Sequence, residues 1–235
     1  MEVLGCRLPD DRLYDVEWGV WWQDEPGRAT ARLGLTASLA SFAGAFRELT
    51  FRPVQGRQDR GRSVATVEST RYTGAVRLPV AAEVVERNES VRQRPRLLND
   101  RPYDDGWVVR VRAADPDEPG RTLATAEQAR ARVEEEIRTR RIRCWPLTPE
   151  TELIEVGVEC AAVLVRLNEE LARRAPGEAL LLVTDDPTSP IEMVRWSDQT
   201  GERLVAHREE AGLHQFLVEK LEHPQPRTRG PTGAR

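Results

Sequence analysis

The sequence predicts two parts: a mainly β N-terminal half and a C-terminal α/β half. From residue 12 to about residue 112, short stretches of alternating apolar and polar residues are cut by Gly and Pro, which is typical of a barrel or sandwich of β-hairpins. Residues 141–150 contain two prolines and are predicted to be a linker. Beyond them the pattern becomes strand, helix, strand, helix, strand, strand, which predicts a two-layer sandwich. The expected divisions are therefore 1–140, a linker at 141–150, 151–222, and a disordered tail at 223–235.

In the N-terminal half, seven stretches are expected to be strands, and two helices interrupt or follow them. The strand stretches are 15–22, 29–35, 47–54, 63–69, 74–80, 82–89 and 106–112. The first helix begins after Thr36 as N-cap and places Leu39, Phe42, Ala43 and Phe46 on one face. The second helix begins with a capping box formed by Thr125 and Gln128, and its apolar stripe is Ala129, Val133 and Ile137.

In the C-terminal half, a strand over 152–156 precedes a helix over 160–175, which ends before Pro176-Gly177. A buried strand follows at 178–185. The next helix is expected to begin with Ser189 as N-cap and Pro190 at its first position, and to end at Gly201. Two last strands, joined at Ala211-Gly212, complete the pattern and carry His207 and His214.

Composition and charge exclude several classes of protein. The 235 residues are 39% hydrophobic and 31% charged, so the chain can bury a core and stay soluble. A net charge of -4 argues against a dedicated nucleic-acid binder, and no stretch reaches the roughly 20 apolar residues of a membrane span. No signal peptide is recognised, and the three cysteines are too few for a disulfide framework. We therefore expect a cytoplasmic protein with reduced thiols, no metal site and no phosphate-binding glycine loop.

The stretch "ATVESTRYTGAV", residues 65–76, is expected to be an exposed hairpin with Arg71 at its apex. Together with "LYDVEW", "AAEVVERNESV" and "LLNDRPYDDGWVVRVR", it resembles the H-protein of the glycine cleavage system. The start "GCRLPDDRLYDVE" is closest to lipoate-binding relatives in bacterial sulfur oxidation. The resemblance covers roughly residues 5–138 and implies a lipoyl-domain-like barrel-sandwich hybrid with flanking helices.

In that family the hairpin carries a lysine that is acylated by lipoate, and Arg71 occupies the corresponding position here. Glu68, Ser69, Tyr72 and Gly74 fit the family pattern. A guanidinium stays protonated and offers no amine for acylation, and the one lysine of the chain, Lys220, lies in the other half. The resemblance therefore implies the carrier fold without lipoate, and no cofactor is expected. Arg71 is either a surface arginine of a lost site, able to pair with Glu68, or a cationic apex that docks on a partner.

From residue 151 to about residue 221 the chain resembles the TusA/SirA family of small sulfur carriers. The matching pieces are "ELIEVGVEC", "APGEALLLVTDDPTSPIEMVRWSDQTGERLV" and "GLHQFLVEK". The resemblance assigns Cys160, just before the first helix, as the residue that would hold sulfur as a persulfide. The helix N-terminus is expected to lower the pKa of its thiol.

The cysteine motif departs from the family pattern, which is usually Cys-Pro-x-Pro. Both prolines are replaced by Ala161 and Val163, and the neighbouring Glu159 is expected to oppose thiolate formation. Cys160 is therefore either a working sulfur-binding thiol or an inert one. Asp185 and Asp186 are expected to cap a loop rather than act as acid or base. Cys144 is either an incidental linker thiol or a relay thiol for Cys160, and Cys6 is expected to be a small packed residue.

Three functions stay open at this point, and whether the chain is an enzyme in its own right is uncertain. The first is a sulfur relay, with Cys160 as carrier and a non-lipoylated N-terminal domain that docks to protein partners. The second is a non-catalytic adapter that has lost both carrier sites. The third is a carrier of the glycine cleavage type, which Arg71 opposes.

Overall fold

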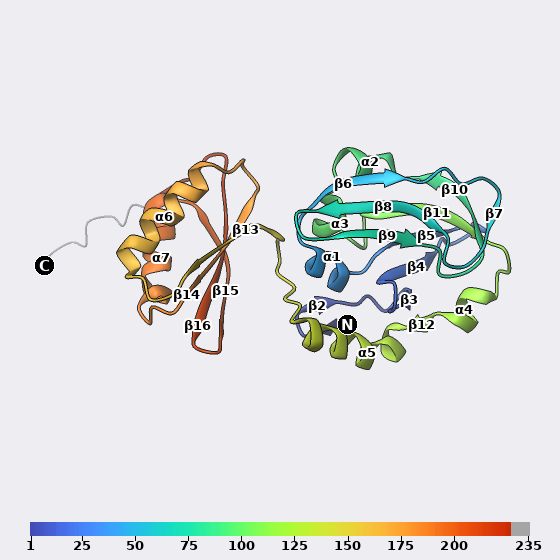
Figure 1. Cartoon of the computed structure of the whole chain (residues 1–235), viewed down its shortest axis with the longest axis horizontal. Coiled ribbons are helices and arrows are strands. Elements are labelled where there is room, and N and C mark those ends of the chain that lie inside the picture. The colour runs from blue at the N-terminus through green and yellow to red at the C-terminus, as the bar shows by residue number, and fades with distance from the viewer. Residues whose placement is uncertain (227–235) are drawn as a thin grey trace, which may run out of the picture. The chain divides into compact units, whose positions relative to one another are not determined.

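The computed structural model describes residues 1–226 and divides the chain into two compact units, Met1–Thr148 and Pro149–Arg235. Within the described residues, no helix is both long and apolar enough to cross a membrane. Strands predominate in the first unit, whereas the second unit combines helices and strands (Figure 1).

The first unit is mainly β, as predicted. Its largest sheet has seven strands in the order β12-β3-β4-β5-β11-β10-β7, and a three-stranded sheet has the order β6-β8-β9. The strands of the large sheet are β3 (Leu13–Asp15), β4 (Val20–Asp24), β5 (Ala31–Leu35), β7 (Arg57–Gln58), β10 (Ala82–Arg87), β11 (Trp107–Ala113) and β12 (Ala124–Thr125). The three-stranded sheet comprises β6 (Phe46–Phe51), β8 (Ser63–Ser69) and β9 (Thr73–Arg77), and β1 (Glu2–Val3) pairs with β2 (Cys6–Arg7).

Alternation along the strands explains the main core of this unit. Side chains of one strand point to opposite faces in turn, so Leu33 and Leu35 of β5 and Val64 of β8 are buried together with Val109 and Val111 of β11. A second cluster forms where the helix α5 (Ala126–Arg140) packs Ala129, Val133 and Ile137 against Tyr14 and Trp21. The predicted apolar stripe of this helix and its capping box are confirmed.

The first helix, α1 (Ala37–Ala43), begins after Thr36 as predicted, and the Thr36 hydroxyl accepts a hydrogen bond from the Leu39 N–H. The expected single apolar face is wrong in two respects. Phe46 already belongs to β6, because the helix ends at Gly44, where φ is +75°. Phe42 is 36% exposed rather than buried. Three short helices were not predicted, namely α2 (Glu89–Gln93), α3 (Leu97–Asp100) and α4 (Glu118–Thr122).

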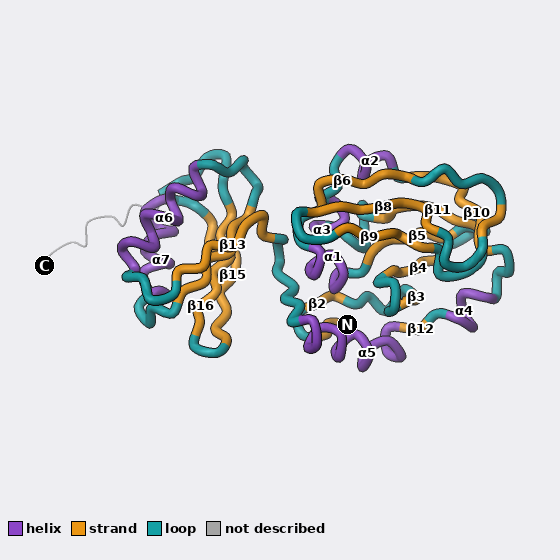
Figure 2. The backbone as a smooth tube through the Cα atoms, in the orientation of Figure 1, coloured by secondary structure: helices purple, strands orange, loops and turns teal. Residues whose placement is uncertain are grey.

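The second unit is the predicted α/β sandwich. Its sheet has the order β13-β14-β16-β15, in which β13 and β14 are parallel and the other pairs are antiparallel. Both helices lie on one face of this sheet (Figure 2), with Leu167 and Trp196 in the core between them and the strands. The elements are β13 (Pro149–Glu155), α6 (Cys160–Ala172), β14 (Ala179–Thr184), α7 (Ser189–Thr200), β15 (Arg203–Glu210) and β16 (Leu213–Glu219).

Details of this unit differ slightly from the expectations. The N-cap of α7 is Thr188 rather than Ser189, whereas Gly201 ends the helix in the left-handed conformation as predicted. At Gly201 an added Cβ would lie 2.4 Å from backbone atoms of Gln225, so residues up to Pro226 pack closely on the end of α7. The expected disordered tail lies outside the described residues from position 227 onward.

Candidate functional site

The predicted hairpin is formed by β8 and β9, and its tip is residues 69–72. The Ser69 N–H donates to the carbonyl of Tyr72 at 2.8 Å, which closes the turn. The Ser69 hydroxyl donates to the Ala43 carbonyl at 2.6 Å and accepts a hydrogen bond from the Arg71 N–H at 3.2 Å. A serine is useful here because one hydroxyl can donate and accept at once. The tip is thus joined to the C-terminal end of α1.

The side chain of Arg71 extends the same connection. Its Nη2 donates to the Ser41 carbonyl at 3.0 Å. A Cβ added at Gly44 would lie 2.8 Å from Arg71 Nε, so the absence of a side chain at Gly44 leaves room for the guanidinium. A cation near the last carbonyls of a helix stabilises them. The pairing of Arg71 with Glu68 stays a prediction.

Gly74 leaves space for the side chain of Tyr72 in the hairpin. The Tyr72 ring packs edge-on against Phe42 and Phe46, with centroid distances of 6.1 and 6.5 Å, and burial raises the pKa of its hydroxyl. A Cβ at Gly74 would lie 2.2 Å from the Tyr72 hydroxyl oxygen. A glycine two residues after the aromatic residue therefore provides the space for its ring.

In the second unit, Cys160 is the first residue of α6, and a loop of residues 156–159, the Cys160 loop, joins it to β13. The side chain of Cys160 is partly exposed, and it is the one free cysteine among the three, all of which the structure describes. The preceding Glu159 makes no capping hydrogen bond with its side chain. Instead, Asp186 Oδ2 accepts from the Cys160 N–H at 3.0 Å, and Asp185 Oδ1 accepts from the Gly157 N–H at 2.7 Å.

Comparison with known families supports the division made by the structure. The family model "Glycine cleavage H-protein" matches residues 12–136, and the family model "Sulfurtransferase TusA" matches residues 155–220. The chain belongs to the glycine cleavage H-protein family. It also carries a TusA domain, so it is a fusion of two carrier-type domains. We name residues 1–148 the H-protein unit and the described residues from Pro149 onward the TusA unit.

Several H-proteins are similar to the H-protein unit. "Glycine cleavage system H protein 5" of Aquifex aeolicus is 36% identical over 147 residues, which cover 61% of this chain and 98% of that protein. "Probable glycine cleavage system H protein 3" of Saccharolobus solfataricus is 35% identical over 139 residues, covering 59% and 97%. A crystal structure of an H-protein from Mycobacterium marinum is similar with a TM-score of 0.44 and 27% identity, and covers 52% of this chain and 96% of that one.

The hairpin of the H-protein unit does not suit covalent lipoate attachment. The guanidinium of Arg71 is a permanently protonated donor and cannot form the amide that a lysine amine forms. Lys220, the only lysine, belongs to the TusA unit, and its Nζ donates to Glu202 Oε1 at 2.6 Å. The H-protein unit therefore offers no lysine amine to which lipoate could be attached.

The structure corrects the expectation for two cysteines. Cys6 and Cys144 form a disulfide across 138 positions, and both are buried in the second core cluster of the H-protein unit. They are therefore not reduced, and Cys144 is not a relay thiol for Cys160 in this state. Because Ile142 is buried in the same cluster, the first part of the predicted linker is integrated into the H-protein unit. Because two of the three cysteines form a disulfide, the cysteine content no longer supports a cytoplasmic location. That location stays a prediction.

The predicted activation of the Cys160 thiol is wrong in direction. Burial raises the pKa of the thiol, and the negative charges of Asp186 and then Glu192 raise it further. The expected opposing residue was Glu159, but the structure places charges from the β14–α7 loop and from α7 near the sulfur. At neutral pH the thiol is therefore held mainly in its protonated form.

The two histidines of the last hairpin contact each other. His207 Nε2 lies 3.2 Å from His214 Nδ1 in the last hairpin, and the His207 ring stacks on Phe216 at 4.4 Å. No group of three or more potential metal ligands occurs among the described residues.

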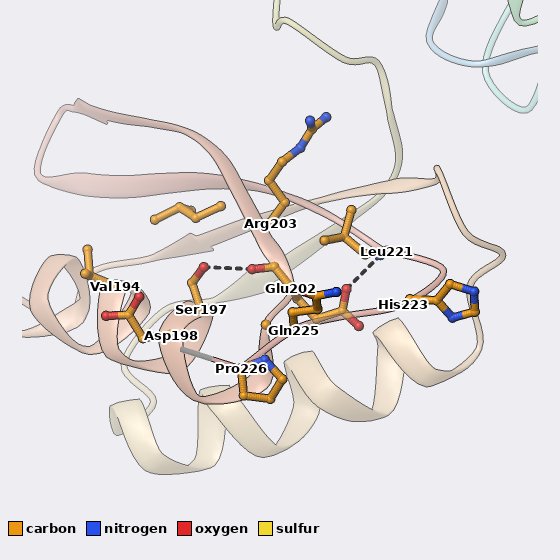
Figure 3. A pocket seen from close by; sticks show the side chains of 11 residues that line it. Val194, Ser197, Asp198, Glu202, Arg203, Leu221, His223, Gln225 and Pro226 are labelled. Atoms are coloured by element: carbon orange, nitrogen blue, oxygen red, sulfur yellow. Dashed lines mark hydrogen bonds between the residues drawn. The ribbon is translucent and has the colours of Figure 1, made fainter. Parts of the chain in front are cut away.

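A cavity of about 700 Å³ at the C-terminal end of α7 is lined by residues including Ser197, Glu202 and His223 (Figure 3). Cys160 does not line it.

Proposed function

We propose that this protein is a sulfur carrier in which Cys160 accepts a sulfane sulfur as a persulfide. The two family matches support a carrier or sulfur-relay role at the level of the family. The observation that carries the finer proposal is the free, partly exposed Cys160 at the start of α6, inside the region matched by TusA.

The transfer is redox-neutral. After the Cys160 thiol loses its proton to solvent, the thiolate attacks the outer sulfur of a donor persulfide, R–S–SH. A new bond forms between Cys160 Sγ and that sulfur, while the S–S bond of the donor breaks and the donor leaves as a thiolate. The same exchange with an acceptor thiolate returns Cys160 to its starting state. No oxidant and no bound cofactor take part.

We further propose that the H-protein unit is not lipoylated and serves as a docking domain for partners of a sulfur-oxidation or sulfur-trafficking system. The support is the chemistry of Arg71 at the hairpin tip together with an exposed aromatic surface beside it. Phe42 is 36% exposed, contacts Tyr72, and has the Arg140 guanidinium 5.0 Å from its ring centroid. Aromatic and arginine side chains are enriched at the centres of protein interfaces.

The direct test is intact-mass analysis after incubation with glutathione persulfide as donor. The expected result is a gain of one sulfur by the native chain, mapped to the peptide that contains Cys160 and absent from Cys160→Ser. No gain by the native chain would refute the carrier function.

Absence of a sulfur gain by the native chain would favour an adapter without covalent chemistry. The specific observation in its favour is the raised pKa of the Cys160 thiol, together with the loss of the lysine at the hairpin tip. An adapter of this kind would keep the partner contacts of the H-protein unit in both the native chain and Cys160→Ser.

A further inference from the structure

We propose that Asp185 and Asp186 are positioning residues that hold the Cys160 loop and place the thiol, and that Asp186 also restrains its reactivity. This inference rests on the proposed function, because it concerns how the carrier thiol is presented. It explains how the loop is held although both prolines of the usual cysteine motif are replaced by Ala161 and Val163.

The two carboxylates fix the loop from its two ends. Asp185 accepts from the N–H of Gly157 at 2.7 Å, two residues after β13 ends, and Asp186 accepts from the N–H of Cys160 at 3.0 Å, where α6 begins. Gly157 has a φ of +72°, and nothing lies within 4 Å of the place that a Cβ would take, so the packing of Val158 on the core is supplemented at Gly157 by the bond to Asp185. Consecutive residues of the β14–α7 loop thus provide a restraint that proline rings would otherwise provide.

Asp186 is itself held in a fixed orientation. Its Oδ1 accepts from the Thr188 N–H at 2.8 Å and from the Thr188 hydroxyl at 2.7 Å, which leaves Oδ2 directed at Cys160. Its own N–H donates to the hydroxyl of the buried Thr184 at 3.3 Å. The hydrogen bonds from Thr188 hold the pKa of Asp186 below its ordinary value, so the carboxylate is ionised at neutral pH.

The same contact has an electrostatic consequence. An anion at a helix N-terminus interacts favourably with the helix dipole, and Asp186 takes this place beside a thiol that would itself become an anion. Asp186 therefore supports the start of α6 and disfavours a second negative charge there. Glu192 of α7, which is paired with Arg195 at 2.7 Å, contributes a like charge from outside the loop.

Three variants separate positioning from charge. Asp185→Ala removes the bond to Gly157; Asp186→Asn removes the charge and leaves one oxygen for two sets of donors; and Glu192→Gln removes a charge outside the loop. Two quantities are measured in each. One is the rate of Cys160 alkylation by iodoacetamide as a function of pH. Alkylation reports on Cys160 alone, because the other two cysteines form a disulfide. The other is amide hydrogen exchange in a peptide that spans residues 156–161.

We expect Asp185→Ala to accelerate exchange in that peptide without moving the midpoint of the alkylation profile. Asp186→Asn should accelerate exchange and move the midpoint to lower pH, raising the rate at pH 7 by about three- to tenfold. Glu192→Gln should move the midpoint by less and leave exchange unchanged. Unchanged exchange in both aspartate variants, or an unchanged midpoint in Asp186→Asn, overturns the proposal.

These outcomes are independent of sulfur uptake. If the native chain gains no sulfur from glutathione persulfide while the variants behave as expected, the carrier function fails and the positioning role stands. If the native chain gains sulfur while the variants match it in both measurements, the positioning role fails and the carrier function stands.

Discussion

The guanidinium of Arg71 donates a hydrogen bond to the carbonyl oxygen of Ser41 at 3.0 Å, which ties the hairpin tip to the last turn of α1. Arg71, at the position that carries the lipoyl group in the family pattern, thus binds to its own domain. This contact accounts for Arg71 locally, since a cation satisfies a helix carbonyl that lacks an intrahelical partner.

The first prediction concerns recovery of lipoylation. In Arg71→Lys the tip regains an acylatable amine, while Glu68, Ser69 and Gly74 keep the geometry of the hairpin. With a lipoate ligase and lipoate, intact mass should show one lipoyl group on Arg71→Lys, and none on the native chain or on Arg71→Ala. A lipoyl group on the native chain would contradict our interpretation of the tip and reopen the glycine cleavage function.

The second prediction concerns the packing of Trp21 on Gly34. The two residues are cross-strand partners, and a Cβ at Gly34 would lie 2.5 Å from the Trp21 ring, which is fully buried and donates through Nε1 to the Pro102 carbonyl. Gly34→Ala should therefore lower the free energy of unfolding by about 2–3 kcal/mol in urea denaturation. The matched control is Gly120→Ala in α4, where an added Cβ meets nothing within 4 Å and should not destabilise.

The third prediction concerns the disulfide. Cys6→Ser/Cys144→Ser should lose about 2–5 kcal/mol of unfolding free energy, because the bond closes a loop across most of the H-protein unit. The native chain with a strong dithiol reductant should approach the double variant. Cys160→Ser should keep the native stability without reductant, since Cys160 lies outside the bond. Equal stability of the native chain with and without reductant, with reduction verified by thiol counting, would refute this role.

The fourth prediction concerns the pH response of the last hairpin. Burial, followed by the proximity of His214, lowers the pKa of His207 below its ordinary value near 6.5. A lowered histidine pKa means that the unfolded chain binds more protons between the two values. The contribution of His207 to stability is therefore full above pH 6.5 and falls as pH drops toward the folded pKa.

The measurement for this pair is an NMR titration of the imidazole C–H resonances. His207 should titrate below pH 6.5 in the native chain, and in His214→Asn its midpoint should rise, while burial keeps it below the ordinary value. An unchanged midpoint in His214→Asn would show that the 3.2 Å contact between the two rings does not couple their protonation.

Much of the fold could be predicted from local patterns. The strand over 63–69 matches β8 residue for residue, and Thr36, Thr125 and Gln128 start their helices as expected. Alternation of period two and capping residues are short-range signals that the sequence carries directly. The short helices α2, α3 and α4 lack a long apolar repeat, so this signal was too weak to predict them.

The candidate site could be predicted in its residues but not in its contacts. The positions of Arg71 and Cys160 follow from their patterns, whereas the acceptor of the Arg71 guanidinium lies 30 positions away and the carboxylate on Cys160 lies 26 positions away. The aspartate pair after β14 was the one signal that could have indicated this contact, since the carboxyl ends of parallel strands meet at one edge of a sheet.

By itself, the sequence determined the two-part architecture and the order of the elements in the C-terminal half, and its resemblance to the H-protein pattern indicated that Arg71 replaces the acylatable lysine. The first two properties depend on residue type and short-range periodicity, and the third depends on the resemblance of the hairpin to the family pattern. Only the tertiary structure decided that Cys6 joins Cys144, that Arg71 bonds to α1, and that burial, followed by the charge of Asp186, raises the pKa of Cys160 instead of lowering it. Each of these depends on distances between residues far apart in the chain, because Coulomb interactions and bonds act through space rather than along the sequence.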